Sequence, residues 1–189
     1  MRVYFDTEFT GLHKETTLIS LGMIDDFGHK FYAIFTDYDK SQCNSWIEEN
    51  VINNLYEGKD SFGRIDFVEG DKDKIKKAIL KWFYKILIKS GDDRIELVSD
   101  VAHYDMVLFI DIFGTAFDLP KYIAPACIDI NQLIAEVSGI SLQEAFDTNR
   151  EDFLEAGYPD HYALKLKNKH NSLYDAIVIK GLFDVLMHI

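Results

Sequence analysis

Acidic side chains and one histidine occupy positions from which they could bind metal ions. They are Asp6, Glu8, Asp105, Asp175 and His170, and each lies at or near the end of a predicted strand or helix. Carboxylate oxygens are the ligands that Mg²⁺ prefers, and a histidine with a pKa near ~6.5 suits a general base at neutral pH. The five residues could therefore hold two divalent cations with a base beside them.

Asp6 and Glu8 form the first pair, two residues apart after the apolar segment Val3-Tyr4-Phe5. Side chains alternate along a strand, so both carboxylates should point to the same face of a sheet. Two like charges side by side at the end of a buried strand are unfavourable unless a cation neutralises them. The pair therefore predicts a divalent metal site.

The segments that would carry these residues alternate between strand and helix patterns. Five strands are predicted, at residues 2–7, 16–24, 29–35, 95–99 and 123–128. Helices are predicted at residues 45–55 with Ser45 as N-cap, 72–89, 104–113 before Gly114, 130–137, 141–154 and 173–187. Residues 57–71 and 151–161 are expected to be loops. This order predicts one α/β domain over residues 1–189, with a mixed five-stranded sheet covered by helices.

The composition is that of a globular protein without a membrane partner. Of 189 residues, 48% are hydrophobic and 28% are charged, and no run reaches the roughly 18 apolar residues of a bilayer span. The N-terminal residues lack the apolar stretch of a signal peptide. Two cysteines, Cys43 and Cys127, exclude a disulfide scaffold or a zinc ribbon and favour a cytoplasmic location.

The overall charge is strongly acidic. Twenty Lys and Arg residues stand against 32 Asp and Glu residues, and the net charge is −12. This charge alone argues against nucleic acid as a partner. However, seven basic residues lie within residues 72–89 and three within 165–169, so basic segments could contact phosphates locally. A solvated helix face is the simpler interpretation of residues 72–89.

Three motifs occur in the order Asp6-Thr7-Glu8, Tyr104-Asp105 and His170-x4-Asp175-Ala176. Together they resemble the three exonuclease motifs of the DEDDh 3′–5′ exonucleases, a family that includes ribonuclease T, oligoribonuclease and the proofreading subunits of DNA polymerases. The resemblance extends from residue 6 to residue 176 and implies a ribonuclease H-like fold. The motif spacing and residues 104–114 are most similar to small bacterial and phage exoribonucleases.

The resemblance implies a role for each residue of the set. Asp6 would bridge two Mg²⁺ or Mn²⁺ ions. Glu8 and Asp175 would complete the site of the first ion, and Asp105 would hold the second through water. His170 would take a proton from the attacking water. The implied activity is that of a two-metal 3′–5′ exoribonuclease, which releases nucleoside 5′-monophosphates from single-stranded RNA ends.

Substrate contacts are implied for the residues around the first motif, Thr7, Phe9, Thr10 and Leu12. In the family, the backbone after this motif contacts the terminal nucleotide, and a leucine wedges between the last two bases. Thr10 could hydrogen-bond the terminal ribose, and Leu12 is either the wedge or an ordinary packing residue. Phe9 replaces a common threonine, and core packing is favoured over base stacking. Lys169, beside His170, could contact a phosphate.

Several alternatives stay open. Asp100 rivals Asp105 because residues 101–103 depart from the His-Asn of many members, but Asp105 adjoins the expected apolar helix. His161 is a rival base whose distance from Asp175 does not fit the motif. The substrate could be single-stranded DNA, or the chain could be an inactive nucleic-acid-binding relative or an acidic interaction domain that matches by accident. Residues 151–161 could form a lid, and the family analogy allows a homodimer.

Overall fold

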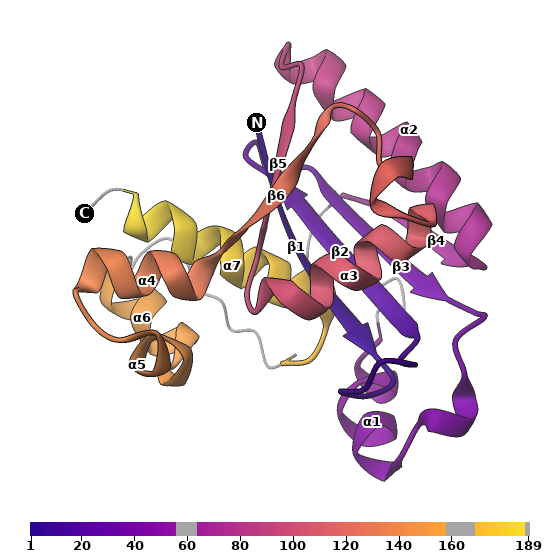
Figure 1. Cartoon of the computed structure of the whole chain (residues 1–189), viewed down its shortest axis with the longest axis horizontal. Coiled ribbons are helices and arrows are strands. Elements are labelled where there is room, and N and C mark those ends of the chain that lie inside the picture. Colours follow the sequence, from indigo (N-terminus) through magenta and orange to yellow (C-terminus); the bar gives the residue numbers. More distant parts are fainter. Residues whose placement is uncertain (56–63, 158–168, 188–189) are drawn as a thin grey trace.

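The computed structural model describes residues 1–55, 64–157 and 169–187, and a six-stranded sheet forms its centre (Figure 1). The strands are β1 (Arg2–Phe9), β2 (Leu18–Asp25), β3 (Lys30–Phe35), β4 (Ile65–Gly70), β5 (Ile95–Ser99) and β6 (Ile123–Asp129), in the order β4-β3-β2-β1-β5-β6. β2 is antiparallel to β1 and β3, and the other pairs are parallel. The predicted mixed sheet is confirmed, with one strand more than expected.

The sixth strand, β4, falls within residues 57–71, which the sequence predicted to be a loop. That prediction was wrong for Ile65–Gly70, which pairs in parallel with β3 along its whole length. The side chains of β4 are half-buried or exposed, and the acidic residues Asp66 and Glu69 interrupt its apolar positions. Backbone pairing with β3 holds this edge strand, and such pairing leaves little pattern in the local sequence.

Seven α-helices are formed by the described residues. They are α1 (Ser45–Asn50), α2 (Lys72–Ser90), α3 (Ala102–Phe113), α4 (Ile130–Ser138), α5 (Leu142–Asp147), α6 (Arg150–Gly157) and α7 (Ser172–Leu186). Within these ranges, no helix combines the length and the apolar character needed to cross a bilayer. α3 ends before Gly114, as predicted, because the backbone of this glycine takes a φ of 116°.

Two helix predictions need correction. α1 is capped by Asn44, whose side chain accepts a hydrogen bond from the backbone of Ile47, rather than by Ser45. The single helix predicted at residues 141–154 is two helices, α5 and α6. The Asn149 side chain accepts the backbone N–H of Glu151 at 3.0 Å and so begins a new helix. The loop predicted at residues 151–161 was therefore wrong for residues 151–157, which belong to α6, and residues 158–161 lie outside the described ranges.

Alternation along β1 determines which side chains face which helices. Val3 and Phe5 join one buried cluster with α2 and α3, whereas Tyr4 joins another with α7. α7 packs against β1 and β2 (Figure 1). Asp6 and Glu8 follow Tyr4 at the same spacing and therefore lie on the face of β1 that α7 covers.

Candidate active site

Three carboxylates meet where α7 crosses β1. Asp6, Glu8 and Asp175 each offer one oxygen atom, and these atoms all lie within 4.8 Å of one another. The first two come from β1, and Asp175 comes from the first turn of α7. The sequence analysis named all three residues, and the structure brings them together.

The start of α7 is fixed by the polar side chains of Asn171 and Ser172. The Asn171 side chain accepts hydrogen bonds from the backbone N–H groups of Leu173 and Tyr174, both at 3.2 Å, and so caps the helix. The hydroxyl groups of Ser172 and Ser20 share a buried hydrogen bond of 2.8 Å, which ties the first turn of α7 to β2. Asp175 is therefore held against β1 with little freedom.

Asp105 lies in the first turn of α3 and is only 4% exposed. Its carboxylate accepts the backbone N–H of Thr7 at 3.2 Å and the Thr7 hydroxyl, while the Ser99 hydroxyl donates to its other oxygen. Thr7 lies between Asp6 and Glu8 in the sequence, so Asp105, the fourth predicted carboxylate, lies beside the cluster. It is not one of the three carboxylates whose oxygen atoms lie within 4.8 Å of one another. These contacts hold the first and second motifs together.

Burial raises the pKa of every carboxyl group in this set, and repulsion between its members adds to the shift for Asp6 and Glu8. The pKa of Asp6 lies well above its usual value because of burial, followed by the charges of Asp105 and Asp175. Burial and these same two charges raise the pKa of Glu8 to about 8. Burial raises the pKa of Asp105 and of Asp175 to about 7. Such high pKa values mark negative charge that lacks compensation.

The donor set fits a divalent cation. In the described ranges, no lysine or arginine forms an ion pair with Asp6, Glu8 or Asp175. Three carboxylates from two elements thus supply oxygen ligands and surplus negative charge at one point. Mg²⁺ and Mn²⁺ are cations that carboxylate oxygens suit.

His170 lies beside the cluster in a pocket of about 630 Å³ that Asp6, Asp175 and Lys169 also line. Its ring packs edge-on against Trp46, with 5.0 Å between the ring centroids, and its backbone N–H is hydrogen-bonded to Asp175. Burial, followed by the charge of Lys169, lowers the pKa of His170. The imidazole is therefore neutral near pH 7 and able to accept a proton.

The residues expected to contact substrate occupy different environments. The Thr7 hydroxyl is bound to Asp105, and Thr10, 2% exposed, has its hydroxyl hydrogen-bonded to Gln42. Phe9 packs against the core and stacks on Tyr104 with 5.5 Å between ring centroids. Leu12, by contrast, is 77% exposed. In this structure, Leu12 alone among these four presents its side chain to solvent.

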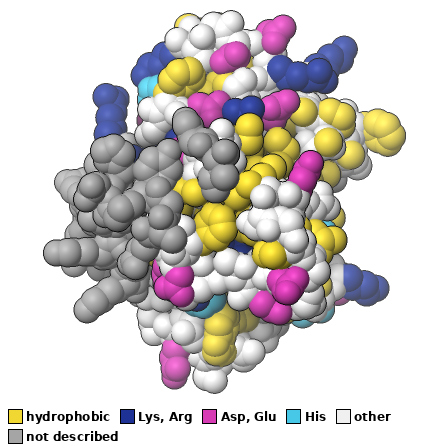
Figure 2. Space-filling model, turned by 90° about the vertical axis from the view of Figure 1, so that its left-hand side faces the viewer, with side chains coloured by type: hydrophobic (Ala, Val, Ile, Leu, Met, Phe, Trp, Pro, Cys, Tyr) yellow, Lys and Arg dark blue, Asp and Glu magenta, His cyan; other side chains and the backbone are white. Residues whose placement is uncertain are grey.

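The α5–α6 segment also lines this pocket, through residues 146–151. Figure 2 shows the side of the molecule that carries these helices, where apolar side chains gather in the middle and Lys and Arg lie mostly at the margins. The exposed apolar side chains of α4 and α5 are Val137, Leu142 and Phe146. Phe146 also lines the pocket.

Comparison with known proteins identifies the family of this chain. A model of the Rv2179c-like family, described as the 3′-5′ exoribonuclease Rv2179c-like domain, matches residues 1–187. The chain belongs to this family. The predicted class of enzyme, a 3′–5′ exonuclease, is thereby confirmed.

Two curated relatives of the Rv2179c-like family come from Mycobacterium tuberculosis. The 3′-5′ exoribonucleases Rv2179c of strain H37Rv and MT2234.1 of strain CDC 1551 are each 29% identical to this chain over 133 residues, which is 70% of this chain and 73% of theirs. A solved structure, titled "3′-end specific recognition of histone mRNA stem-loop by 3′-exonuclease", matches 98% of this chain and 62% of its own, with a TM-score of 0.60 and 16% identity. This match supports the ribonuclease H-like fold.

The sequence analysis missed one feature of the site in this Rv2179c-like domain. Asp100, considered as a rival of Asp105, lines the same pocket as Asp6 and is paired with Arg150, which also lines it. Nothing in the sequence pointed to Arg150, because a partner 50 residues away leaves no local pattern. Asp105 is hydrogen-bonded to Thr7, between Asp6 and Glu8, whereas Asp100 lines the pocket, so the structure places both candidates close to the cluster.

The lysine-rich helix α2 lies away from the carboxylates. It covers the face of the sheet that carries Val3 and Phe5, whereas Asp6 and Glu8 are on the α7 face. Of its lysines, Lys85 donates to Asp66 at 2.6 Å. The solvated-face interpretation of this helix is therefore the one the geometry supports. The rival base His161 lies outside the described residues.

Proposed function

We propose that this member of the Rv2179c-like family hydrolyses single-stranded RNA from its 3′ end and releases nucleoside 5′-monophosphates, with two divalent cations as cofactors. The observation that carries the proposal is the group of Asp6, Glu8 and Asp175 within 4.8 Å, next to Asp105. The exoribonuclease names of the curated relatives favour RNA as the substrate. DNA of the same polarity is the alternative that the experiment below tests.

Each carboxylate would contribute to cation binding in a different way. Asp6 would be shared by both ions, Glu8 and Asp175 would serve one, and Asp105 would serve the other. When bound, two Mg²⁺ or Mn²⁺ ions supply an acidified water and neutralise charge on the leaving 3′ oxygen. Thr7 and Ser99 keep the Asp105 carboxylate oriented by donating to both of its oxygens. The protein therefore provides a fixed set of oxygen ligands.

His170 would act as the general base. Its lowered pKa keeps the ring neutral, so it can take a proton from water at neutral pH. The hydrogen bond from its backbone to Asp175 links its position to that of the cluster. Lys169, on the same pocket wall, would contact the phosphate of the substrate, and the exposed Leu12 would contact its bases.

The proposal includes the setting in which the enzyme works. Cys43 and Cys127 are both free thiols. Free thiols are typical of a reducing compartment, so we place the enzyme in the cytoplasm. Because the family model extends over residues 1–187, we also treat the chain as one catalytic domain.

Product analysis on matched substrates tests the function. RNA and DNA single strands of one sequence, labelled at the 5′ or the 3′ end, are incubated with the protein and Mn²⁺. We expect a descending ladder from 5′-labelled RNA, labelled mononucleotide from 3′-labelled RNA and little change in DNA. Asp6→Asn should abolish the ladder, whereas Asp93→Asn, at an exposed site, should not. Equal or faster DNA cleavage would overturn the RNA assignment, and no cleavage of either would indicate an inactive relative.

A further inference from the structure

Asp100 places a further carboxylate at the edge of the cation cluster. It follows β5 directly and lines the same pocket as Asp6 and Asp175. Its charge is among those that raise the pKa of Asp6, Asp105 and Asp175, so it lies close enough to act on all three. The mechanism proposed above gives Asp100 no part. A fifth negative group beside four others requires a physical explanation.

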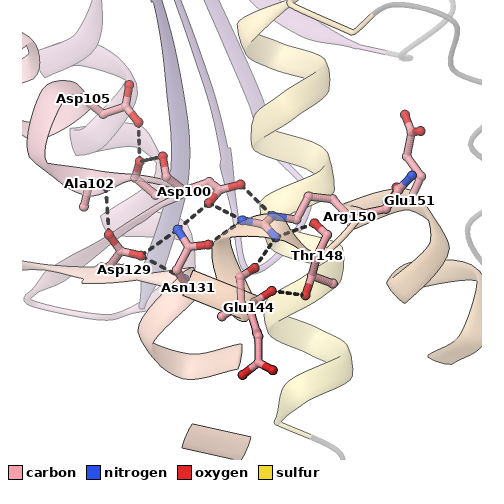
Figure 3. Close-up of polar contacts among 12 residues, drawn as sticks. Asp100, Ala102, Asp105, Asp129, Asn131, Glu144, Thr148, Arg150 and Glu151 are labelled. Carbon is pink, nitrogen blue, oxygen red and sulfur yellow. Dashed lines mark hydrogen bonds and ion pairs between the residues drawn. The ribbon is translucent and has the colours of Figure 1, made fainter. Parts of the chain in front are cut away.

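Arg150 is the ion-pair partner of Asp100. The Arg150 Nε donates to Asp100 Oδ2 at 2.9 Å, and Nη2 donates to Oδ1 at 3.1 Å. The two side chains are only 16% and 22% exposed. A bidentate guanidinium–carboxylate pair of this kind fixes both charge and direction. Both oxygens of Asp100 are thereby turned toward Arg150 (Figure 3).

The remaining donors of Arg150 are also used inside the protein. Nη1 donates to the carbonyl oxygens of Ala145 and Thr148, both at 2.7 Å, and Nη2 donates also to the side-chain oxygen of Asn131. A guanidinium has five N–H groups, and these contacts occupy all of them. Arg150 lines the catalytic pocket but has no donor left for a substrate phosphate. Its hydrogen bonds therefore serve to hold other parts of the protein in place.

The Asp100 carboxylate is held from a second side. Asn131 Nδ2 donates to Asp100 Oδ1 at 2.8 Å and to Asp129 Oδ1 at 3.1 Å, and Asp129 Oδ2 accepts the backbone N–H of Ala102 at 3.1 Å (Figure 3). This chain of contacts spans the turn at Val101, a β-branched residue with an unfavourable φ of 61°. The network therefore anchors the turn that leads into α3 and Asp105.

We propose that Arg150 is a positioning residue that keeps the Asp100 carboxylate out of the cation cluster. This inference rests on the proposed function. Arg150 neutralises Asp100 and engages both of its oxygens in hydrogen bonds, so that the ligand set remains the four carboxylates of the motifs. With Arg150 absent, Asp100 becomes an uncompensated carboxylate that competes for the cations and disturbs their placement.

Four variants separate charge compensation from simple mechanical support. Arg150→Gln leaves Asp100 uncompensated, Asp100→Asn removes the competing charge, and the double variant removes both. Arg150→Lys keeps the charge but loses most of the hydrogen bonds. Mn²⁺ affinity and the number of ions bound are read by electron paramagnetic resonance, together with kcat, KM and the melting temperature.

Charge compensation predicts a specific order among the variants. Arg150→Gln should lose about 10- to 100-fold in kcat or Mn²⁺ affinity, as loss of groups that orient metal ligands typically does. The double variant and Arg150→Lys should keep most of the wild-type kcat and Mn²⁺ affinity, while KM changes little. An Asp100→Asn variant as impaired as Arg150→Gln, or a double variant that is no better, would overturn the inference in favour of mechanical support.

The test stays informative in two further circumstances. If Arg150→Gln does not fold, Arg150→Lys decides, because wild-type Mn²⁺ binding is then expected and its loss refutes the inference. Failure of the proposed function would show as a wild-type protein without Mn²⁺-dependent hydrolysis. Failure of this inference would show as an active wild type in which Asp100→Asn is as impaired as Arg150→Gln, or in which the double variant is no better than Arg150→Gln.

Discussion

The backbone nitrogen of Leu173 lies 2.2 Å from the point that a β-carbon on residue 22 would occupy, and residue 22 is glycine. Gly22 is the direct partner of Asp6 across the β1–β2 pair, so both residues are on the face that α7 covers. Because Gly22 has no side chain, the first turn of α7 rests on the backbone of β2. This close approach brings Asp175 within reach of Asp6.

A side chain at Gly22 should therefore separate α7 from β2. We expect Gly22→Ala to reduce the free energy of unfolding by about 1–3 kcal/mol, as overpacking does, and to weaken Mn²⁺ binding as Asp175 moves away. Urea denaturation and Mn²⁺ titration measure the two effects. The control is Gly70→Ala in β4, where the added carbon meets only the flexible Lys74 side chain. Wild-type Mn²⁺ affinity in Gly22→Ala would contradict this account.

The stability of the metal-free protein should fall as pH rises. The pKa of Glu8 is raised to about 8, and the pKa values of Asp105 and Asp175 to about 7. Unfolded carboxyl groups titrate near pH ~4. Between these limits the folded chain binds more protons than the unfolded chain, so the free energy of unfolding decreases by up to about 1.4 kcal/mol per pH unit for each proton. Denaturation from pH 5 to pH 8 measures this slope.

Two comparisons check the origin of that slope. Asp6→Asn should flatten it and stabilise the metal-free protein near pH 8, because one charge of the repelling set is removed. Mn²⁺ should stabilise the wild type more as pH rises, because cation and protons compete for the same oxygens. Equal slopes in wild type and Asp6→Asn would show that the cluster does not cause the effect.

Lys169 should tune the pKa of His170, the proposed general base. Its charge is one of the two causes that lower the pKa of His170, so Lys169→Met should raise that pKa toward its ordinary value near ~6.5. Proton titration of the imidazole by NMR measures the shift directly. In hydrolysis, the loss of rate on acidification should then begin at higher pH. Lys77→Met, on the exposed side of α2, is the control, and equal His170 titration in all three proteins would refute the coupling.

The exposed side chain of Leu12 should affect the binding of substrate but not the stability of the fold. Leu12 is 77% exposed, so Leu12→Ala should change the free energy of unfolding by less than about 0.5 kcal/mol. If Leu12 contacts the terminal bases, KM for RNA should rise. Leu142→Ala on α5, which is 58% exposed, provides a matched control. An unchanged KM would leave Leu12 without a role in binding.

Local patterns were enough to predict much of the site. Alternation along β1 put Asp6 and Glu8 on one face, and the start of α7 was correctly placed before Asp175. By contrast, β4 and the Asp100–Arg150 pair depend on contacts between distant segments. Such contacts are decided by the packed fold, and the local sequence carries little trace of them.

A residue that was expected to contact substrate illustrates the same limit. Thr10 follows the first motif, yet its hydroxyl is turned inward to Gln42, a partner 32 residues away. The break between α5 and α6 likewise depends on Asn149 capping a new helix instead of continuing the old one. The Thr10 contact is long-range and leaves no local pattern, whereas the Asn149 cap is a local contact within a segment that also fits one continuous helix.

The placement of the carboxylates on β1 and α7 also affects when an active enzyme exists. During synthesis, β1, β2 and β3 can pair early, because each is close to the next in the chain. Asp175 follows Asp6 only after almost all the other described elements have been made. A nascent chain therefore lacks a complete cluster until α7 emerges and docks. Until then, the chain carries only two of the three clustered carboxylates, Asp6 and Glu8.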